Sequence, residues 1–231
     1  MRYALYFTPP ADDVLTMAAA RWLGRDAFAG NTLPQPEIPG FSPEEFAALT
    51  ADPRRYGFHA TLKAPFALRE GRTEEALLDA FAEFCANNAP LTVPSVRVDQ
   101  LGPFFALVPS ALYADLQTFA ARIVEAFDPF RAPLSEADRA RRKPERLSET
   151  ERALLDRWGY PYVMDAFRFH MTLTGPVPEA QAPAMAAATS KAFHPFIDRP
   201  LEISGLGLFQ EPSPGAAFTL HTWLPLQGKR G

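Results

Sequence analysis

An eight-residue pattern occurs twice in this chain, and the two copies stand at matching places in two halves of similar order. Residues 58–65 read FHATLKAP and residues 169–176 read FHMTLTGP, so both copies follow F-H-x-T-L-x-x-P. The copies lie about 110 residues apart. A repeat of that length is too long for a solenoid, whose units have about 20–50 residues. The duplication therefore predicts two similar lobes.

The elements around the two motifs follow one order in each half: strand, helix, excursion, strand, helix, strand. We expect strands at 3–7, 56–63, 91–98, 103–108, 163–174, 201–209 and 217–224. The expected helices follow the capping residues Asp12 or Asp13, Ser42, Thr73, Ser110 and Ser148, and an alanine-rich helix covers 180–193. The pattern predicts an α+β chain.

Alternation along each motif strand separates a polar face from an apolar one. The polar set consists of His59, Thr61, Lys63, His170, Thr172 and Thr174. The other face of each strand is apolar, so helices can cover it. Two lobes related by a pseudo-twofold axis would bring the two polar faces together across one cleft.

Paired histidines and hydroxyls of this kind suit phosphodiester chemistry. A neutral imidazole takes a proton from the attacking water or hydroxyl, and a protonated one donates to the leaving oxygen. We therefore predict His59 and His170 as the catalytic acid and base, with the two roles unassigned. Thr61 and Thr172 are the predicted phosphate-binding residues, because their hydroxyls can stabilise charge on the non-bridging oxygens. Behind them, Lys63 and Thr174 are candidate substrate-binding residues.

Composition and charge disfavour several other classes of protein. The chain has 231 residues, a formal net charge of -4 and a single cysteine, Cys85, so no internal disulfide can form. The slight acidity disfavours a broad nucleic-acid surface but allows a local anion pocket. Neither motif brings the carboxylate or third histidine of a hydrolytic metal site, so we expect no metal and no cofactor. Without an apolar run of 18 residues, we expect a cytoplasmic protein with no membrane partner.

The two motifs resemble the 2H phosphoesterase superfamily, which is named for paired H-x-[ST] strands. Within it, the stretches YGFHATLK (56–63) and FRFHMTLTG (167–175) are similar to a bacterial branch of unknown function associated with phosphonate metabolism. The resemblance covers nearly the whole chain. It implies a bilobal duplicated 2H phosphoesterase-like fold, with two antiparallel sheets facing a central cleft and helices outside. It also implies metal-independent opening or hydrolysis of a cyclic phosphate or small phosphodiester of nucleotide or ribose type.

On this basis we expect a single bilobal catalytic domain over 1–231, with lobe one at 1–102, lobe two at 103–231 and strand exchange between the lobes. The substrate is a small-molecule cyclic phosphate or phosphodiester. An RNA end is a disfavoured alternative, and the sequence does not fix the oligomeric state.

Residues that flank the motifs are weaker candidates for substrate binding. Arg55 and Tyr56 precede the first motif, and Arg168 precedes the second. The basic run within 139–146 is interleaved with acids, which favours a solvated mixed-charge helix. Its alternative is a lid that supplies an arginine to an anionic substrate.

Two other functions stay open at this stage. The same fold could bind a nucleotide or RNA end without turnover, although the two intact His-x-Thr pairs argue against decay of an active site. A scaffold that contacts only protein partners is the third interpretation.

Overall fold

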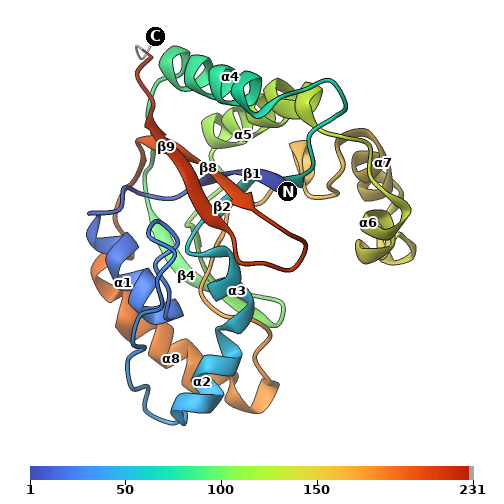
Figure 1. Cartoon of the computed structure of the whole chain (residues 1–231). Helices are drawn as coiled ribbons and strands as arrows, with labels where there is room; N and C mark the ends of the chain where they lie inside the picture. The colour runs from blue at the N-terminus through green and yellow to red at the C-terminus, as the bar shows by residue number, and fades with distance from the viewer. Residues whose placement is uncertain (229–231) are drawn as a thin grey trace.

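A computed structural model describes residues 1–228, and its centre is an antiparallel sheet with helices on the outside (Figure 1). Seven strands form this sheet in the order β4-β5-β6-β2-β1-β8-β9, and β3 pairs with β7 in a separate two-stranded sheet. The strands are β1 (Arg2–Phe7), β2 (Ala60–Phe66), β3 (Leu91–Val93), β4 (Val96–Leu101), β5 (Phe104–Pro109), β6 (Met171–Thr172), β7 (Leu201–Ile203), β8 (Gly205–Glu211) and β9 (Thr219–Pro225).

The helices occupy the intervals between these strands. The α-helices are α1 (Val14–Leu23), α2 (Pro43–Leu49), α3 (Ala51–Tyr56), α4 (Glu74–Asn87), α5 (Ala114–Phe127), α6 (Glu136–Arg141), α7 (Glu149–Trp158) and α8 (Ala182–Phe193). Short 3-10 turns are η1 (Asp128–Phe130), η2 (Pro144–Arg146), η3 (Met164–Ala166), η4 (Glu179–Gln181) and η5 (His194–Phe196). In the described part of the chain, no helix has the length and apolar character needed to cross a membrane.

The strand order is symmetric about the junction of β6 and β2. Reading outward, β6, β5 and β4 on one side correspond to β2, β1 and β8 on the other. The same correspondence relates the partners β3 and β7, and it relates α8 packing on β4 to α4 packing on β8. This order is what two copies of one strand–helix unit produce when they are related by a pseudo-twofold axis.

The predicted α+β class, with antiparallel sheets and outer helices, is confirmed. One detail differs from the expected arrangement, because the two motif strands are neighbours in a single sheet and do not face each other from two sheets. β4 comes from the first half and pairs with β5 of the second, while β8 of the second half pairs with β1 of the first. The division into lobes 1–102 and 103–231 remains a proposal.

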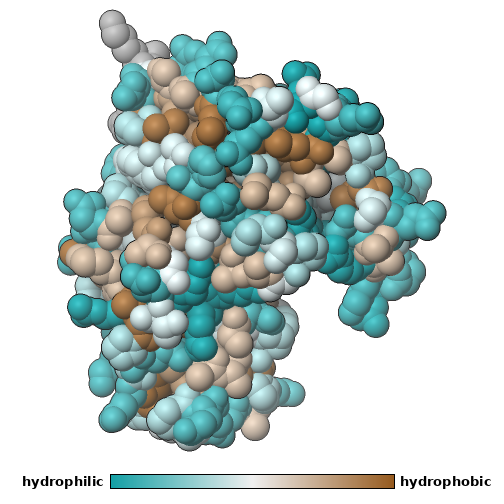
Figure 2. Space-filling model, viewed as in Figure 1, coloured by the Kyte–Doolittle hydropathy of each residue, from teal (hydrophilic) through white to brown (hydrophobic). Residues whose placement is uncertain are grey.

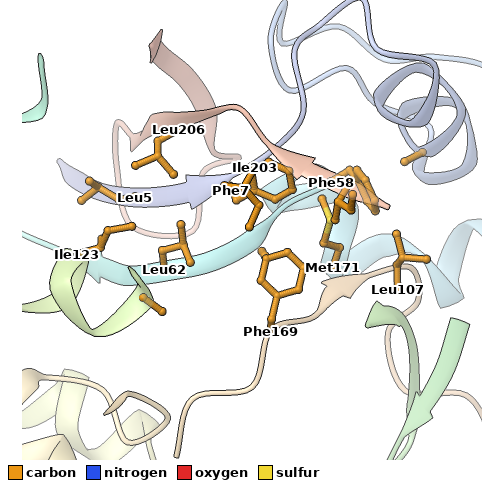
Figure 3. Packing of buried hydrophobic residues seen from close by; sticks show 14 of the residues in the cluster. Leu5, Phe7, Phe58, Leu62, Leu107, Ile123, Phe169, Met171, Ile203 and Leu206 are labelled. Carbon is orange, nitrogen blue, oxygen red and sulfur yellow. The ribbon is translucent and has the colours of Figure 1, made fainter. Parts of the chain in front are cut away.

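The apolar face of the motif strands lies in the main hydrophobic core. Phe58, Leu62, Phe169 and Met171 are all buried there, and Figure 3 shows them beside Phe7 of β1. The rings of Phe7 and Phe169 have centroids 5.9 Å apart. The expected apolar face is therefore confirmed at these positions, and it anchors both histidine-bearing segments from beneath.

Most predicted helix starts are confirmed by cap geometry. Asp13 accepts a hydrogen bond from the Leu15 backbone N–H, and Thr73 accepts one from Ala76. At two of the predicted caps, Ser42 of α2 and Ser148 of α7, the side chains form complete capping boxes. Such caps satisfy backbone N–H groups that have no partner within the helix.

Several predicted boundaries are wrong. The expected strands 91–98 and 201–209 are each divided into two strands, β3 and β4 in the first case and β7 and β8 in the second. Residues up to Tyr56 belong to α3, because Gly57 ends that helix and the strand begins only at Ala60. Most of 163–174 is irregular, and only Met171–Thr172 forms a strand. The helix expected after Ser110 begins at Ala114, with Tyr113 as its N-cap.

The excursion of the second half, residues 128–158, forms an arm that stands out from the body of the molecule. The arm contains α6, η2 and α7, drawn at the right of Figure 1. Its surface is largely hydrophilic, and an open notch separates it from the lower part of the molecule (Figure 2). Arg131, near the start of the arm, donates to the Arg157 carbonyl near its end at 3.1 Å. The arm is therefore closed at its base.

Candidate active site

The two motifs meet where β2 pairs with β6 through Ala60 and Met171. These two side chains point into the core, so the residues that flank them point to the opposite face. In an antiparallel register this places each motif histidine across from the threonine of the other motif. Facing positions of neighbouring strands lie about 4.5–5.5 Å apart between Cα atoms. The four side chains therefore form one compact polar group.

Both histidines are held by the same backbone contact. His59 Nδ1 lies 2.9 Å from the Gly57 carbonyl, and His170 Nδ1 lies 2.7 Å from the Arg168 carbonyl. A carbonyl only accepts, so Nδ1 must carry the proton in each ring. In the neutral imidazole this leaves Nε2 with a lone pair. Both rings thus present the nitrogen that can exchange a proton with a substrate.

His59 packs against aromatic rings and is half-buried. Its imidazole stacks on Tyr6 at 3.8 Å between centroids, and its Nε2 lies 3.1 Å from Thr61 Oγ1. The pKa of His59 is lowered to about 4: burial is the largest cause, the hydrogen bond to the Gly57 carbonyl opposes it, and the nearby His170 adds a smaller lowering effect. His59 is therefore neutral at neutral pH, and its Nε2 accepts a hydrogen bond from the Thr61 hydroxyl.

His170 lies on the wall of a cavity of about 620 Å³. Thr61, Arg168 and Tyr160 line the same cavity, as does Phe104, whose ring centroid is 5.8 Å from that of His170. Burial lowers the pKa of His170 below its ordinary 6.5, and the Arg168 carbonyl opposes the shift. The cavity therefore brings one histidine and the threonine of the other motif to one space.

The structure also contains a larger cavity, of about 870 Å³, that lies elsewhere. Its lining comes from 24–46 together with Arg54, and no residue of either motif contributes to it. Arg54 is occupied there by hydrogen bonds to Gln35 and to backbone carbonyls. The smaller cavity is the better candidate site because His170, Thr61 and Arg168 line it, although His59 and Thr172 are not part of the lining.

Lys63 lies away from the polar face, which corrects the prediction that it binds substrate. Tyr6 of β1 pairs with Thr61, but the next residue, Leu5, pairs with Lys63. This β-bulge reverses the alternation after Thr61, so Lys63 shares the face of Leu5. Lys63 is only 2% exposed, and its Nζ donates to Asp128 Oδ1 at 2.8 Å. Its ammonium group therefore forms a buried ion pair in the core and does not face the cavity.

Thr174 is also placed away from the cavity, for a related reason. The backbone N–H groups of Leu173 and Thr174 both donate to the Phe105 carbonyl, at 2.9 and 3.3 Å, which breaks the regular ladder after Thr172. Thr174 is fully buried, and its hydroxyl accepts from the Phe105 N–H at 3.0 Å. Its hydroxyl is used in holding β5, and the prediction that it binds substrate is wrong.

Of the three flanking candidates, Arg55 and Tyr56 are held by other side chains, whereas Arg168 is available in the cavity. Arg55 is committed to an ion pair with Glu211 and to the Ala216 carbonyl, and its guanidinium also contacts the rings of Tyr56 and Phe218. Tyr56 packs near His59, at 6.1 Å between ring centroids. Arg168 is exposed and lines the cavity, and among residues 1–228 its guanidinium has no hydrogen-bond or ion-pair partner. Arg168 remains a candidate for binding an anion.

Sequence reasoning did not select Tyr6 and Tyr160 as parts of the site. Tyr6 stands on β1, and its pairing with Thr61 brings its ring to His59. Tyr160 reaches the cavity from the end of the arm, about ten residues before the second motif. The aromatic alternation of β1 was a signal for Tyr6, but no local pattern distinguishes Tyr160. Among residues 1–228, no group of three or more His, Cys, Asp or Glu side chains is placed to hold a metal ion.

Comparison with known proteins gives relatives along the whole chain. It is 41% identical, over 99% of its length, to the ribose 1,5-bisphosphate phosphokinase PhnN of Janthinobacterium sp. (strain Marseille). It is 37% identical, again over 99% of its length, to the protein of that name from Laribacter hongkongensis (strain HLHK9). The chain spans about half the length of these curated relatives, 51% and 53%.

Two solved structures are similar at low sequence identity. The crystal structure of TT0787 of Thermus thermophilus matches with a TM-score of 0.45 and 17% identity, covering all of both chains. A crystal structure described as a phosphoesterase matches with a TM-score of 0.40 and 12% identity, covering 97% of this chain and 98% of the other.

The family profile described as "Protein of unknown function (DUF1045)" matches residues 61–219, which include the first motif from its threonine onward and all of the second. This agrees with the expected membership in a bacterial family of unknown function. The chain belongs to the DUF1045 family.

Proposed function

We propose that this chain is a phosphodiesterase that opens or hydrolyses a cyclic phosphate or small phosphodiester. One observation carries the proposal: two histidines with the same Nδ1 contact present Nε2 on one face of one strand pair, each beside a threonine hydroxyl. Two imidazoles so placed can remove a proton on one side of a phosphorus atom and deliver one on the other.

In the proposed mechanism, His59 is the base and His170 is the acid. The lowered pKa of His59, about 4, keeps its Nε2 unprotonated. When the Thr61 hydroxyl turns from this nitrogen to the bound phosphate, Nε2 can take a proton from the attacking water. The water oxygen forms a bond to phosphorus as the ester P–O bond breaks. His170, protonated at Nε2, gives its proton to the leaving oxygen, and exchange with solvent restores both rings. The reaction converts a diester into a monoester without change of oxidation state.

The threonines and Arg168 have the role of binding the phosphate. Hydroxyls of Thr61 and Thr172 can donate to the non-bridging oxygens, where negative charge gathers in the transition state. Arg168 adds a guanidinium at the cavity wall, and a guanidinium matches a phosphate with two parallel hydrogen bonds. This arrangement requires neither a metal ion nor a cofactor.

We propose a ribose-type cyclic phosphate as the substrate class. The curated relatives are named as kinases of ribose 1,5-bisphosphate, and this chain corresponds to about half of their length. Opening a cyclic phosphate on ribose leaves a ribose phosphate monoester, which is the class of compound in that name. This part of the proposal includes the link to phosphonate metabolism that the resemblance implies.

A screen of cyclic phosphates and linear phosphodiesters, followed by phosphorus NMR in the presence of a chelator, tests the proposal. We expect turnover by the wild type, and a loss of about 10²- to 10⁴-fold in the His59→Ala and His170→Ala variants. His194→Ala is the matched control, because His194 is exposed at the end of α8 and outside the site.

Three results would contradict the proposal. Full activity in the double histidine variant would remove the assigned acid and base. A strict requirement for added metal would point to a different mechanism. Tight binding of a cyclic nucleotide without product over hours would make the chain a binding protein of the same fold.

A further inference from the structure

Arg142 is an unusual arginine within the arm. It is half-buried, whereas the neighbouring Arg141 is exposed. Arg141 pairs with Asp138, and Arg139 pairs with Asp156. Among residues 1–228, no carboxylate or carbonyl accepts a hydrogen bond from the Arg142 guanidinium, which instead contacts the Tyr160 ring at 4.8 Å from its centroid.

The Tyr160 ring connects Arg142 to the candidate active site. Tyr160 lines the cavity that also holds His170 and Thr61. Burial raises the pKa of Tyr160, and Arg142 acts in the opposite direction. Burial raises the pKa of Tyr6, the residue stacked on His59, and Tyr160 adds to this shift, so the Tyr160 phenol lies within electrostatic reach of the other side of the site. Arg142 is not itself part of the cavity lining, but it contacts a residue that is, so its guanidinium lies next to the cavity.

A guanidinium that contacts an aromatic ring keeps its hydrogen-bonding edges. Arginine carries five N–H donors in its plane, and contact with a ring face uses none of them. Partial burial excludes water from one side of the group, and a positive charge in that setting favours an anion that accepts two hydrogen bonds. Phosphate monoesters have this geometry and charge.

The carboxylates near the cavity do not neutralise Arg142. Glu151 lines the cavity, but its carboxylate is bound to the Ser148 backbone N–H in the capping box of α7. Asp165, also in the lining, is exposed and forms no ion pair in the described part of the chain. An incoming anion therefore has an unpaired guanidinium to bind.

We propose that Arg142 is a specificity-determining residue, whose guanidinium binds a second phosphate of the substrate, distinct from the phosphodiester that lies between the histidines. This inference rests on the proposed function and deepens it. The substrate class becomes a sugar cyclic phosphate that also carries a phosphate monoester. In this proposal the arm helps to select the substrate and is more than the solvated mixed-charge helix that the sequence favours.

Matched substrates with and without the second phosphate test the assignment. Ribose 1,2-cyclic phosphate and its 5-phosphate form one pair, and adenosine 2′,3′-cyclic phosphate and its 5′-phosphate form the other. The quantity measured is the ratio of kcat/KM within each pair. We expect the wild type to favour the phosphorylated member of at least one pair by about ten- to hundred-fold, the range for a charge-assisted hydrogen-bonded contact.

Variants of the arm then identify the residue responsible. Arg142→Ala should bring that ratio close to one, and Arg142→Lys should restore part of it, because lysine keeps the charge but loses the paired donors. Arg146→Ala is the matched control, since Arg146 is an exposed arginine of the same arm. If Arg142 only supports the arm, its loss would lower kcat/KM for both members alike and leave the ratio unchanged.

Calorimetry in a His170→Ala background measures binding of the same pairs without turnover. If the wild type turns over none of the compounds, the proposed function is wrong. The role of Arg142 is then tested by the ratio of the dissociation constants within each pair, as measured by calorimetry. A wild type without preference, or an Arg142→Ala variant that keeps the preference, would overturn the inference.

Discussion

At the scale of single residues, the two motif histidines share a backbone contact but differ in their surroundings. His59 stacks on Tyr6 and contacts Thr61, while His170 lies beside Phe104 on the cavity wall. Burial is the largest cause of the lowered pKa in both, and the charge of His170 adds to the effect at His59. The same local geometry therefore yields two groups of different basicity.

The pH dependence of kcat/KM follows from these shifts. The base must be deprotonated, so activity should rise as the pH passes about 4, the pKa of His59. The acid must be protonated, so activity should fall as the pH passes the pKa of His170, which lies below 6.5. We therefore expect a bell-shaped profile with its maximum on the acid side of neutrality. A profile that still rises above pH 7 would contradict the assignment of roles.

Gly57 is the residue on which the position of His59 depends. Its φ of 79° and ψ of 175° lie in a region that only glycine adopts readily, and a Cβ there would lie 2.3 Å from the Ala27 Cβ. Gly57→Ala should destabilise the fold by about 1–3 kcal/mol. It should also lower kcat/KM, because the carbonyl that holds His59 Nδ1 moves.

Denaturant unfolding and a rate assay measure the two effects. Gly71→Ala is the control, because Gly71 has a similar φ of 78° with no atom within 4 Å of its ideal Cβ. An equal loss of stability in both variants, with activity intact in Gly57→Ala, would show that the Gly57 carbonyl does not position the imidazole.

At the scale of elements, the sequence predicts the strands and helices well but not their irregularities. Periodicity and capping residues mark β1, α2, α4 and α8, because these signals are local. The bulge that turns Lys63 beneath the sheet depends on its pairing with Leu5 and on Asp128, which are distant in the chain. Alternation alone therefore places Thr61 correctly and Lys63 wrongly. Likewise, Tyr160 reaches the site only through the path of the arm.

Asp128 connects the arm to the strand that carries the first motif. Its carboxylate accepts from Lys63 at 2.8 Å and from Arg131 at 2.9 Å. Burial is the first cause of the lowered pKa of Lys63, about 8, and Asp128 opposes it. Asp128→Ala should destabilise the protein by about 3–5 kcal/mol, because it leaves a buried ammonium with the Val124 carbonyl but without its counter-charge.

Urea unfolding of Asp128→Ala against Asp156→Ala provides the measurement. Asp156 pairs with Arg139 on the exposed surface of the arm, so its loss should change the free energy of unfolding by less than about 1 kcal/mol. Similar losses in the two variants would mean that the Lys63–Asp128–Arg131 cluster does not hold the arm to the sheet.

At the scale of the whole molecule, each half of the chain supplies a strand to the other half. β4 pairs with β5, and β8 pairs with β1, while one hydrophobic core contains residues from both halves. Segments 1–102 and 103–231 should therefore remain unfolded when expressed separately and regain a folded spectrum when combined. Circular dichroism measures the folding of the segments and sedimentation measures their association, with the intact chain as the reference. A cooperative thermal transition in either isolated segment would contradict the expectation.

The symmetry of the strand order has a consequence for the proton chemistry. A true twofold axis would give the two imidazoles equal proton affinities, so neither ring would be preferred as the acid or as the base. Here the axis relates backbones but not side chains: Tyr6 covers one ring, while the other ring faces the open cavity. The duplicated backbone brings the two imidazoles together, and their different neighbours give one the role of base and the other the role of acid in the proposed mechanism.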